Sequence, residues 1–360
     1  MRVARSRVEA ARAQCYAGAM ELRRLGTCGL KVSAISLGAM TFGESQTFMK
    51  GVTSTDDEAK HVFDRAIEAG VNLVDTANVY GDGASEVLTG QWIKGKRDKV
   101  LLATKCRFPM GMGTGKPIGP HDMGLSRQHV VQACEASLKR LGTDVIDLYQ
   151  VHMQDTSVRI DETLRALDDL VRAGKIRYFG CSNYTGYRLV ESLWSADKHG
   201  TGRYEAVQLQ WSLMVRDAER EVVPACKANQ LGILVWSPLA GGFLSGKYQR
   251  GMQQPAGTRM GEWKDTWKRI DKDHNWHILD VVGRIAKKRE TTPAAISLAW
   301  LLARPEVSTV IAGARNSRQL DDNLKALDVK LAADELKELD DASKPEWGYP
   351  YAFIGMREPW

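Results

Sequence analysis

The chain has 360 residues, of which 43% are hydrophobic and 26% charged, with 33 glycines and 11 prolines. This composition is typical of a folded globular protein and excludes disordered, collagen-like and coiled-coil chains. The 50 basic and 44 acidic residues leave a net charge of +6 spread along the chain, which argues against a nucleic-acid-binding protein, and the absence of an 18-residue apolar run argues against a membrane span.

The first twenty residues are basic and lack the apolar run of a secretory signal. We expect residues 1–20 to be a disordered or helical extension rather than a transit peptide. One folded domain is expected over residues 21–344, followed by an aromatic tail over residues 345–360. The six cysteines are widely separated and form no Cys-x-x-Cys pair, so we interpret them as free thiols of a cytoplasmic protein.

Beyond residue 20, short β-branched, apolar segments alternate with longer segments of helical periodicity. The eight predicted strands are residues 35–40, 73–77, 100–105, 145–152, 176–182, 206–211, 232–238 and 308–313. The predicted helices include residues 55–69, 126–141, 161–173, 187–198 and 217–230, and the helix-ending glycines are Gly70, Gly142, Gly174 and Gly232. Eight such β–α units close most simply into a (β/α)8 TIM barrel.

The alternative architecture is an open, doubly wound sheet. No Gly-x-Gly-x-x-Gly motif opens a helix after the first predicted strand, and the glycines at residues 111–115 run into Lys116-Pro117 instead of a helix. The barrel is therefore preferred. Long segments at residues 107–125 and 241–275, together with the tail, are expected to wall the pocket at the face where barrels keep their active sites.

Four polar residues lie at the ends of the predicted strands: Asp75 and Tyr80 at the end of the second, Lys105 at the end of the third and His152 at the end of the fourth. In a parallel barrel, these strand ends meet at one mouth. The ammonium of Lys105 would stabilise the Tyr80 phenolate and lower the pKa of the phenol, while Asp75 would keep a buried lysine charged. His152 would donate a hydrogen bond to a carbonyl oxygen beside Tyr80. We predict that these four residues are catalytic.

The segments that carry these residues resemble the aldo-keto reductase superfamily. They are Asp75-Thr76-Ala77-x-x-Tyr80-Gly81, Leu101-Leu102-Ala103-Thr104-Lys105, Asp147-Leu148-Tyr149-Gln150-Val151-His152, Gly180-Cys181-Ser182-Asn183-Tyr184, Trp236-Ser237-Pro238-Leu239-Ala240-Gly241-Gly242 and Ile311-Ala312-Gly313-Ala314-Arg315. The likeness covers residues 20–341 in the family's order. Residues 237–248 resemble the bacterial and potassium-channel β-subunit-like branch.

The resemblance implies reversible hydride transfer between a nicotinamide and a carbonyl, in which Tyr80 is the general acid, Lys105 and Asp75 tune it, and His152 binds the carbonyl. It also implies a cofactor that lies extended across the mouth without a Rossmann motif. The residues matching that cofactor site are Ser182, Asn183 and Gln208 at the carboxamide, Trp236 on the ring, Thr41 and Asp75 near the ribose, Ser237, Leu239, Gly241 and Lys247 over the pyrophosphate, and Asp322 at the adenine.

The adenosine end decides between NADP and NAD, because a 2′-phosphate needs cationic or donor groups. Gly313 and Arg315 precede a predicted helix, whose N-terminal donors would add to the arginine. The remaining residues of this predicted clamp are Lys247, Arg259, Gln319 and Asn323. NADPH is therefore the predicted cofactor. The alternative is that Arg315 and Arg259 are ordinary solvated surface residues.

The remaining candidate residues are not assigned a role in the reaction. Trp211 is expected to line the substrate pocket, with a core position as the alternative, and no metal is expected at His274 and His277 because no third ligand completes the set. Aromatic residues gather in the long loop and the tail, either to stack on a substrate or to cover the barrel or a subunit contact. These are Trp263, Trp267, Trp276, Trp347, Tyr349, Tyr351, Phe353 and Trp360.

The predicted function is NADPH-dependent reduction of an aldehyde, ketone or sugar-like carbonyl by a cytoplasmic enzyme. One alternative is a redox-sensing regulatory or scaffold subunit that binds NADP(H) with little turnover. Another is a dehydrogenase that runs mainly in the oxidising direction on the same residues. The expected partner is a small-molecule carbonyl or alcohol, with no nucleic acid and no membrane, and homo-oligomerisation is left open.

Overall fold

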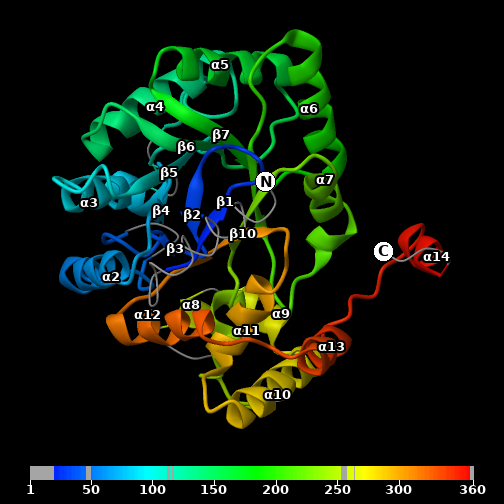
Figure 1. The fold of residues 1–360 in the computed structure, drawn as a ribbon. Helices are drawn as coiled ribbons and strands as arrows, with labels where there is room; N and C mark the ends of the chain where they lie inside the picture. The colour runs from blue at the N-terminus through cyan, green and yellow to red at the C-terminus, as the bar shows by residue number, and fades with distance from the viewer. Residues whose placement is uncertain are drawn as a thin grey trace, which may run out of the picture.

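The protein is described by a computed structural model covering residues 20–45, 50–111, 114–115, 117–252, 258–262 and 264–356, without the side chains of Arg259 and Lys264. The predictions for residues 1–19, Trp263 and Trp360 lie outside these ranges. Within them, the chain closes into a barrel of eight parallel strands ringed by helices (Figure 1). The predicted (β/α)8 fold is confirmed.

Each barrel strand pairs with the next one along the chain, and β10 returns to pair with β3, as Val310 does with Ile35. The barrel strands are β3 (Ile35–Gly38), β4 (Leu73–Asp75), β5 (Leu101–Cys106), β6 (Ile146–Val151), β7 (Ile176–Ser182), β8 (Ala206–Gln210), β9 (Gly232–Trp236) and β10 (Val307–Ala312). All eight predicted strands are present, although several end earlier than predicted. His152 therefore lies just beyond β6.

The helices cover the outside of the barrel. They are α2 (Asp56–Glu68), α3 (Ala84–Trp92), α4 (Arg127–Leu141), α5 (Ile160–Arg172), α6 (Gly186–His199), α7 (Val222–Ala228), α8 (Arg259–Glu262), α9 (Lys264–Ile270), α10 (Asp273–Lys288), α11 (Pro293–Leu302), α12 (Ser317–Leu324), α13 (Ala333–Ala342) and α14 (Tyr351–Gly355). Their ends follow capping chemistry: the Ser126 side chain accepts the His129 N–H, and Gly142 ends α4 at φ +61°. No helix in the described ranges is long and apolar enough to cross a membrane.

Two local predictions were wrong. The helix expected over residues 217–230 is divided into a 3₁₀ turn, η2 (Asp217–Arg220), and α7. Pro224 explains the break, because its ring cannot follow a helical residue 220 without a clash and has no N–H to donate. Gly232 does not end a helix but begins β9, and Gln230 takes the left-handed conformation there, at φ +58°.

An N-terminal hairpin, which the sequence pattern did not predict, closes one end of the barrel. Its strands, β1 (Leu22–Arg24) and β2 (Lys31–Ser33), pair antiparallel and are blue in Figure 1. The hairpin is pressed against the start of β9, so a Cβ on Gly232 would lie 2.6 Å from a methyl carbon of Leu25. Leu25, Leu30 and Val32 fill the barrel end as part of a small core cluster.

Side chains inside the barrel form layers, because every second residue of a strand points inward. The layer nearest the hairpin is apolar, and its strand residues are Leu73, Ala103, Leu148, Ala206 and Leu234. Two residues further along the same five strands come Asp75, Lys105, Gln150, Gln208 and Trp236. A polar layer therefore lies directly above the apolar plug, at the end of the barrel opposite the hairpin.

The long segment after β9, predicted as a loop, contains the 3₁₀ turn η3 (Ala240–Ser245) and the short helices α8 and α9. Trp267 of α9 and Trp276 of α10 are buried against Tyr248 and Phe243, respectively, so these two aromatics belong to the core and do not line the cavity. The described part of the tail includes α14, which stands off the outer ring (red in Figure 1).

Candidate active site

The four residues predicted to be catalytic meet at the open end of the barrel. Lys105 on β5 is completely buried, and its Nζ lies 2.6 Å from Asp75 Oδ2, 2.8 Å from the Thr76 carbonyl and 3.4 Å from the Tyr80 hydroxyl. The Tyr80 and His152 rings meet edge to face, with centroids 5.8 Å apart. The carboxylate thus contacts the ammonium, the ammonium contacts the phenol, and the phenol ring contacts the imidazole.

Lys105 keeps its positive charge despite burial. Loss of water lowers the pKa of Lys105, but the negative charge of Asp75, aided by Tyr80, outweighs this effect and holds that pKa above its usual value. The lysine therefore stays an ammonium at neutral pH. This ammonium lies next to the phenol oxygen, where it favours the phenolate.

His152 is neutral at neutral pH. Its ring is withdrawn from water, and Lys105 and Arg107 place positive charge nearby, so the pKa of His152 lies well below its usual value. A neutral imidazole carries one N–H and can donate a hydrogen bond without bringing a charge. Phe108 packs against the other side of the ring, with centroids 5.0 Å apart.

Tyr80 is carried by a 3₁₀ turn, η1 (Tyr80–Gly83), which residues 76–79 connect to the end of β4. The turn needs left-handed backbone at Gly81, Asp82 and Gly83, and Gly83 leaves room for Arg140, which a Cβ would approach to 2.8 Å. The Asp82 carboxylate accepts the Gly111 N–H at 2.6 Å. These contacts tie the turn to the neighbouring loop, so the phenol is held on a braced backbone.

A buried pair of amides supports Asp75 from the other side. Gln208 Nε2 donates to Asp75 Oδ1 at 2.8 Å, and Gln150 Nε2 donates to the same oxygen at 3.2 Å. Gln208 Nε2 also lies 3.1 Å from Gln150 Oε1. Gln208 was predicted to hold a carboxamide, whereas Gln150 was not singled out, although it lies two residues before His152 on the same strand face.

A cavity of about 1230 Å³ opens above this layer. That volume exceeds the roughly 300–1,000 Å³ of an ordinary small-ligand pocket. Every residue predicted to contact the cofactor lines it except Arg259, whose side chain lies outside the described part of the chain. The lining residues among them are Thr41, Asp75, Ser182, Asn183, Gln208, Trp236, Ser237, Leu239, Gly241, Lys247, Gly313, Arg315, Gln319, Asp322 and Asn323.

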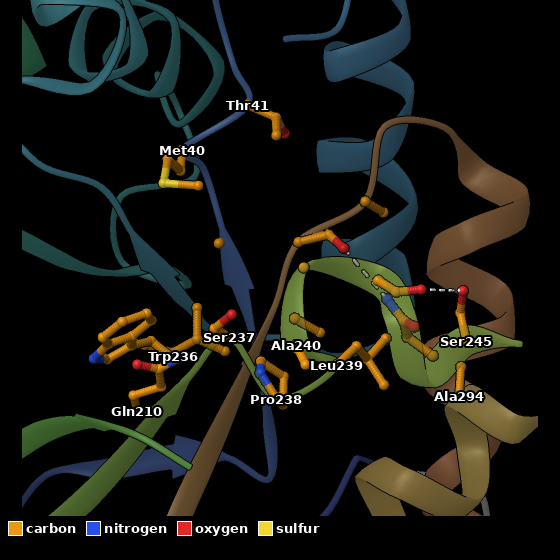
Figure 2. Close-up of a pocket in the computed structure, with 18 of the residues that line it drawn as sticks. Met40, Thr41, Gln210, Trp236, Ser237, Pro238, Leu239, Ala240, Ser245 and Ala294 are labelled. Carbon is orange, nitrogen blue, oxygen red and sulfur yellow. Dashed lines mark hydrogen bonds between the residues drawn. The ribbon is translucent and has the colours of Figure 1, made fainter. Parts of the chain in front are cut away.

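The segment after β9 wraps one side of the cavity (Figure 2). Ser237, Ala240, Gly241 and Gly242 all have positive φ, and the Ser245 hydroxyl donates to the Gly242 carbonyl at 2.7 Å. Strained non-glycine backbone of this kind is typical of ligand-binding loops. A Cβ at Gly242 would come within 2.8 Å of the Lys247 ammonium, so the glycine lets that lysine fold back over the loop.

Several lining residues were missed from the sequence. Arg318 and Arg269 add two cations to the lining, and Met40 and Phe108 add apolar surface. Trp211 was expected in the pocket but is buried outside the barrel, where it packs on Trp300 and donates to Glu219 at 2.8 Å. Strand alternation gives the reason: Gln208 and Gln210 share the inner face of β8, so the next residue points outward.

The tail does not contribute to the cavity lining within the described residues. Tyr351 instead donates a hydrogen bond to Glu221, and the guanidinium of Arg220 lies 5.1 Å from the Tyr351 ring centroid. Tyr349, Phe353 and Met356 are exposed. In the described ranges, no group of three His, Cys, Asp or Glu side chains is placed to hold a metal ion.

Comparison with known proteins agrees with this geometry. The Aldo/keto reductase family matches residues 34–344. An uncharacterized oxidoreductase of Bacillus subtilis is 38% identical over 331 residues, which cover 89% of this chain and 95% of the relative. "Probable aldo-keto reductase 1" of Glycine max is 35% identical over 89% of this chain and 88% of its own length.

A third relative, named "Probable voltage-gated potassium channel subunit beta" in Arabidopsis thaliana, is 34% identical over 86% of this chain and 92% of its own length. It corresponds to the branch that the sequence motifs resemble. With its motifs in order around a closed eight-stranded barrel, the chain belongs to the aldo/keto reductase family.

Proposed function

We propose that the protein is an NADPH-dependent reductase of aldehydes, ketones or sugar-like carbonyls that uses Tyr80 as its general acid. The observation that carries this proposal is the contact between a buried, charged Lys105 and the Tyr80 hydroxyl at 3.4 Å, at the floor of a large cavity. A binding protein has no need of a buried ammonium beside a phenol. A phenol that must donate a proton at neutral pH, in contrast, needs a neighbouring positive charge to lower its pKa.

The residues present suit a nicotinamide cofactor. Three residues that line the cavity each carry a buried polar atom with no hydrogen-bond partner among the described residues, namely Thr41 Oγ1, His152 Nδ1 and Trp236 Nε1. Such atoms are costly unless a ligand satisfies them. When bound, a reduced nicotinamide supplies the hydride. We assign its carboxamide to Ser182, Asn183 and Gln208, and its stacking surface to Trp236.

The chain's own groups then handle the proton. His152, neutral and beside Tyr80, orients the carbonyl oxygen by a hydrogen bond, and Tyr80 gives that oxygen its proton as negative charge develops there. Lys105 stabilises the phenolate that remains, and Asp75 keeps Lys105 charged. The same groups run in reverse for alcohol oxidation, so the direction depends on the cofactor ratio and the substrate.

The Arabidopsis relative's name supports one alternative, a regulatory or scaffold subunit that binds the cofactor with little turnover. The two proposals differ in the role of Tyr80. In an enzyme the phenol acts at the transition state, whereas in a sensor only nucleotide binding matters.

The deciding experiment is the Tyr80→Phe variant, which removes one hydroxyl. We expect kcat for carbonyl reduction to fall by at least a hundredfold, because general acid catalysis contributes about 10²–10⁴-fold. NADPH affinity, followed by quenching of tryptophan fluorescence, should stay within about threefold of the wild type.

Wild-type turnover in Tyr80→Phe would remove the tyrosine as the acid. Tight NADPH binding by the wild type, without turnover on a panel of aldehydes and ketones, would favour the regulatory subunit instead.

A further inference from the structure

Gln150 occupies the polar layer without lining the cavity. Its side chain is completely buried, and its residue pairs in register with Lys105 on the adjacent strand. Burying an amide inside a barrel is costly unless each of its polar atoms is satisfied. The buried amide of Gln150 is therefore stabilised by its hydrogen bonds to the neighbouring Asp75 and Gln208.

The hydrogen bonds around Gln150 have a fixed direction. An ionised Asp75 can only accept, so both glutamines must turn their NH₂ groups toward Oδ1. Gln150 then offers its Oε1 to Gln208 at 3.1 Å, and Gln208 is left with its own Oε1 for the cavity. The other oxygen of Asp75 is thereby turned toward Lys105, at 2.6 Å.

We propose that Gln150 is a positioning residue for proton transfer: it fixes the rotation of the Asp75 carboxylate, and so the placement of Lys105 beside Tyr80. This inference rests on the proposed reductase function. Gln150 touches none of the reacting groups and acts on Asp75 directly and through Gln208.

The Gln150→Leu variant keeps the volume of the side chain and removes its donor and acceptor. We expect kcat to fall about tenfold, because Asp75 loses one of two donors at Oδ1 and its orientation relaxes. NADPH affinity should stay within about twofold of the wild type, because Gln208 keeps its own 2.8 Å bond to Asp75. Loss in kcat without loss of binding separates positioning from general damage.

The Gln150→Glu variant gives a sharper readout. A protonated carboxyl reproduces the amide pattern, with its O–H donating to Asp75 and its C=O accepting from Gln208, but two touching carboxyls cannot both ionise cheaply. We expect kcat relative to wild type to be near one at pH 6 and to fall about tenfold by pH 9. The Gln150→Leu ratio should be flat over the same range.

The matched control is Thr309→Val, which removes a completely buried hydrogen bond to Ser36 elsewhere in the barrel. Its kcat should stay within twofold of the wild type at every pH. Thermal unfolding of the cofactor-free proteins gives a second readout: Tm of Gln150→Glu should lie below that of the wild type already at pH 6, because the unfolded glutamate is ionised above about pH 4.3, and the difference should be larger at pH 9.

Two outcomes would overturn the inference alone: Gln150→Leu losing no more kcat than Thr309→Val, or a Gln150→Glu ratio that does not change with pH. A wild type that binds NADPH but reduces no carbonyl would instead overturn the proposed function, and the positioning role with it.

Discussion

The two histidines with lowered pKa values, His152 and His129, make stability depend on pH. Withdrawal from water lowers the pKa of His129 below its usual value, although the His121 carbonyl and Asp122 oppose this, and burial with nearby positive charge lowers that of His152 further. Both rings stay neutral in the folded protein at a pH where the unfolded chain already binds a proton. Stability is therefore complete above about pH 6.5 and is lost as the pH falls toward the folded-state values.

For each histidine, the free energy of unfolding is expected to fall by about 1.4 kcal/mol for each pH unit below about 6.5, until the folded-state pKa is reached. Urea unfolding at pH 7.5 and 5.5 measures this loss for the wild type, His152→Gln and His129→Gln. Each variant should show a smaller loss than the wild type. An unchanged loss in His152→Gln would mean that this ring is already charged when folded.

For single residues, the sequence predicted those positions that follow from side-chain alternation along a strand and from the location of strand ends. Asp75, Lys105 and His152 lie at the ends of recognisable strands, so their meeting at one mouth could be predicted. For Trp211 the resemblance favoured the pocket and left a core position as the alternative; the structure shows the core position, which strand alternation from Gln208 also indicates. Gln150 was missed because an amide inside an apolar strand has no signature until its partner, Asp75, is seen across the barrel.

Packing between the helices can be tested with two glycines that have opposite surroundings. Gly90 in α3 is pressed against α4, where an added Cβ would lie 2.6 Å from the carbonyl carbon of Leu141. Gly283 in α10 has nothing within 4 Å of an added Cβ. Only the second can therefore take a methyl group without movement of the backbone.

We expect Gly283→Ala to raise the free energy of unfolding by about 0.5–1 kcal/mol, since alanine is the better helix former. Gly90→Ala should lower it by about 1–3 kcal/mol, because two packed helices must separate. Urea unfolding at pH 7.5 measures both. A stabilised Gly90→Ala protein would show that α3 and α4 are more loosely packed than the structure indicates.

Whole elements were predictable where their signals are local. Apolar runs gave the barrel strands, and capping residues such as Ser126 and Gly142 gave the helix ends. The β1–β2 hairpin was missed because three-residue strands carry no periodicity, and their stability comes from the barrel end they cover. The helix expected over residues 217–230 shows the opposite situation. Pro224 is a local signal for its division at Glu221, but the helical periodicity of the segment was given more weight than the proline.

Across the whole molecule, the cavity joins two chemically different ends. Tyr80, the proposed acid, lines the cavity beside the paired Lys105 and Asp75, and Arg315 and Arg318 line it at the start of α12. A helix N-terminus with adjacent cations suits a phosphate. This division supports the assignment of the adenosine 2′-phosphate to the α12 end.

The Arg315→Ala variant should weaken NADPH binding by tenfold or more and NADH binding by less than twofold, because only NADPH carries the extra phosphate. Fluorescence titration with both nucleotides measures this. Arg172→Ala, which removes an exposed arginine from α5 beside Asp168, is the control for loss of charge. Equal weakening of both nucleotides by Arg315→Ala would mean that this arginine does not distinguish them.

The β1–β2 hairpin closes the end of the barrel opposite the cavity mouth, so the two ends of the barrel differ. Thr27, exposed at the tip of that hairpin, lies at the far end of the barrel from Tyr80. A protein fixed to a bead or an electrode through this tip would therefore present its mouth to the surrounding solution, with reactants free to come and go. Attachment through the segment after β9 would bring the support up against that mouth.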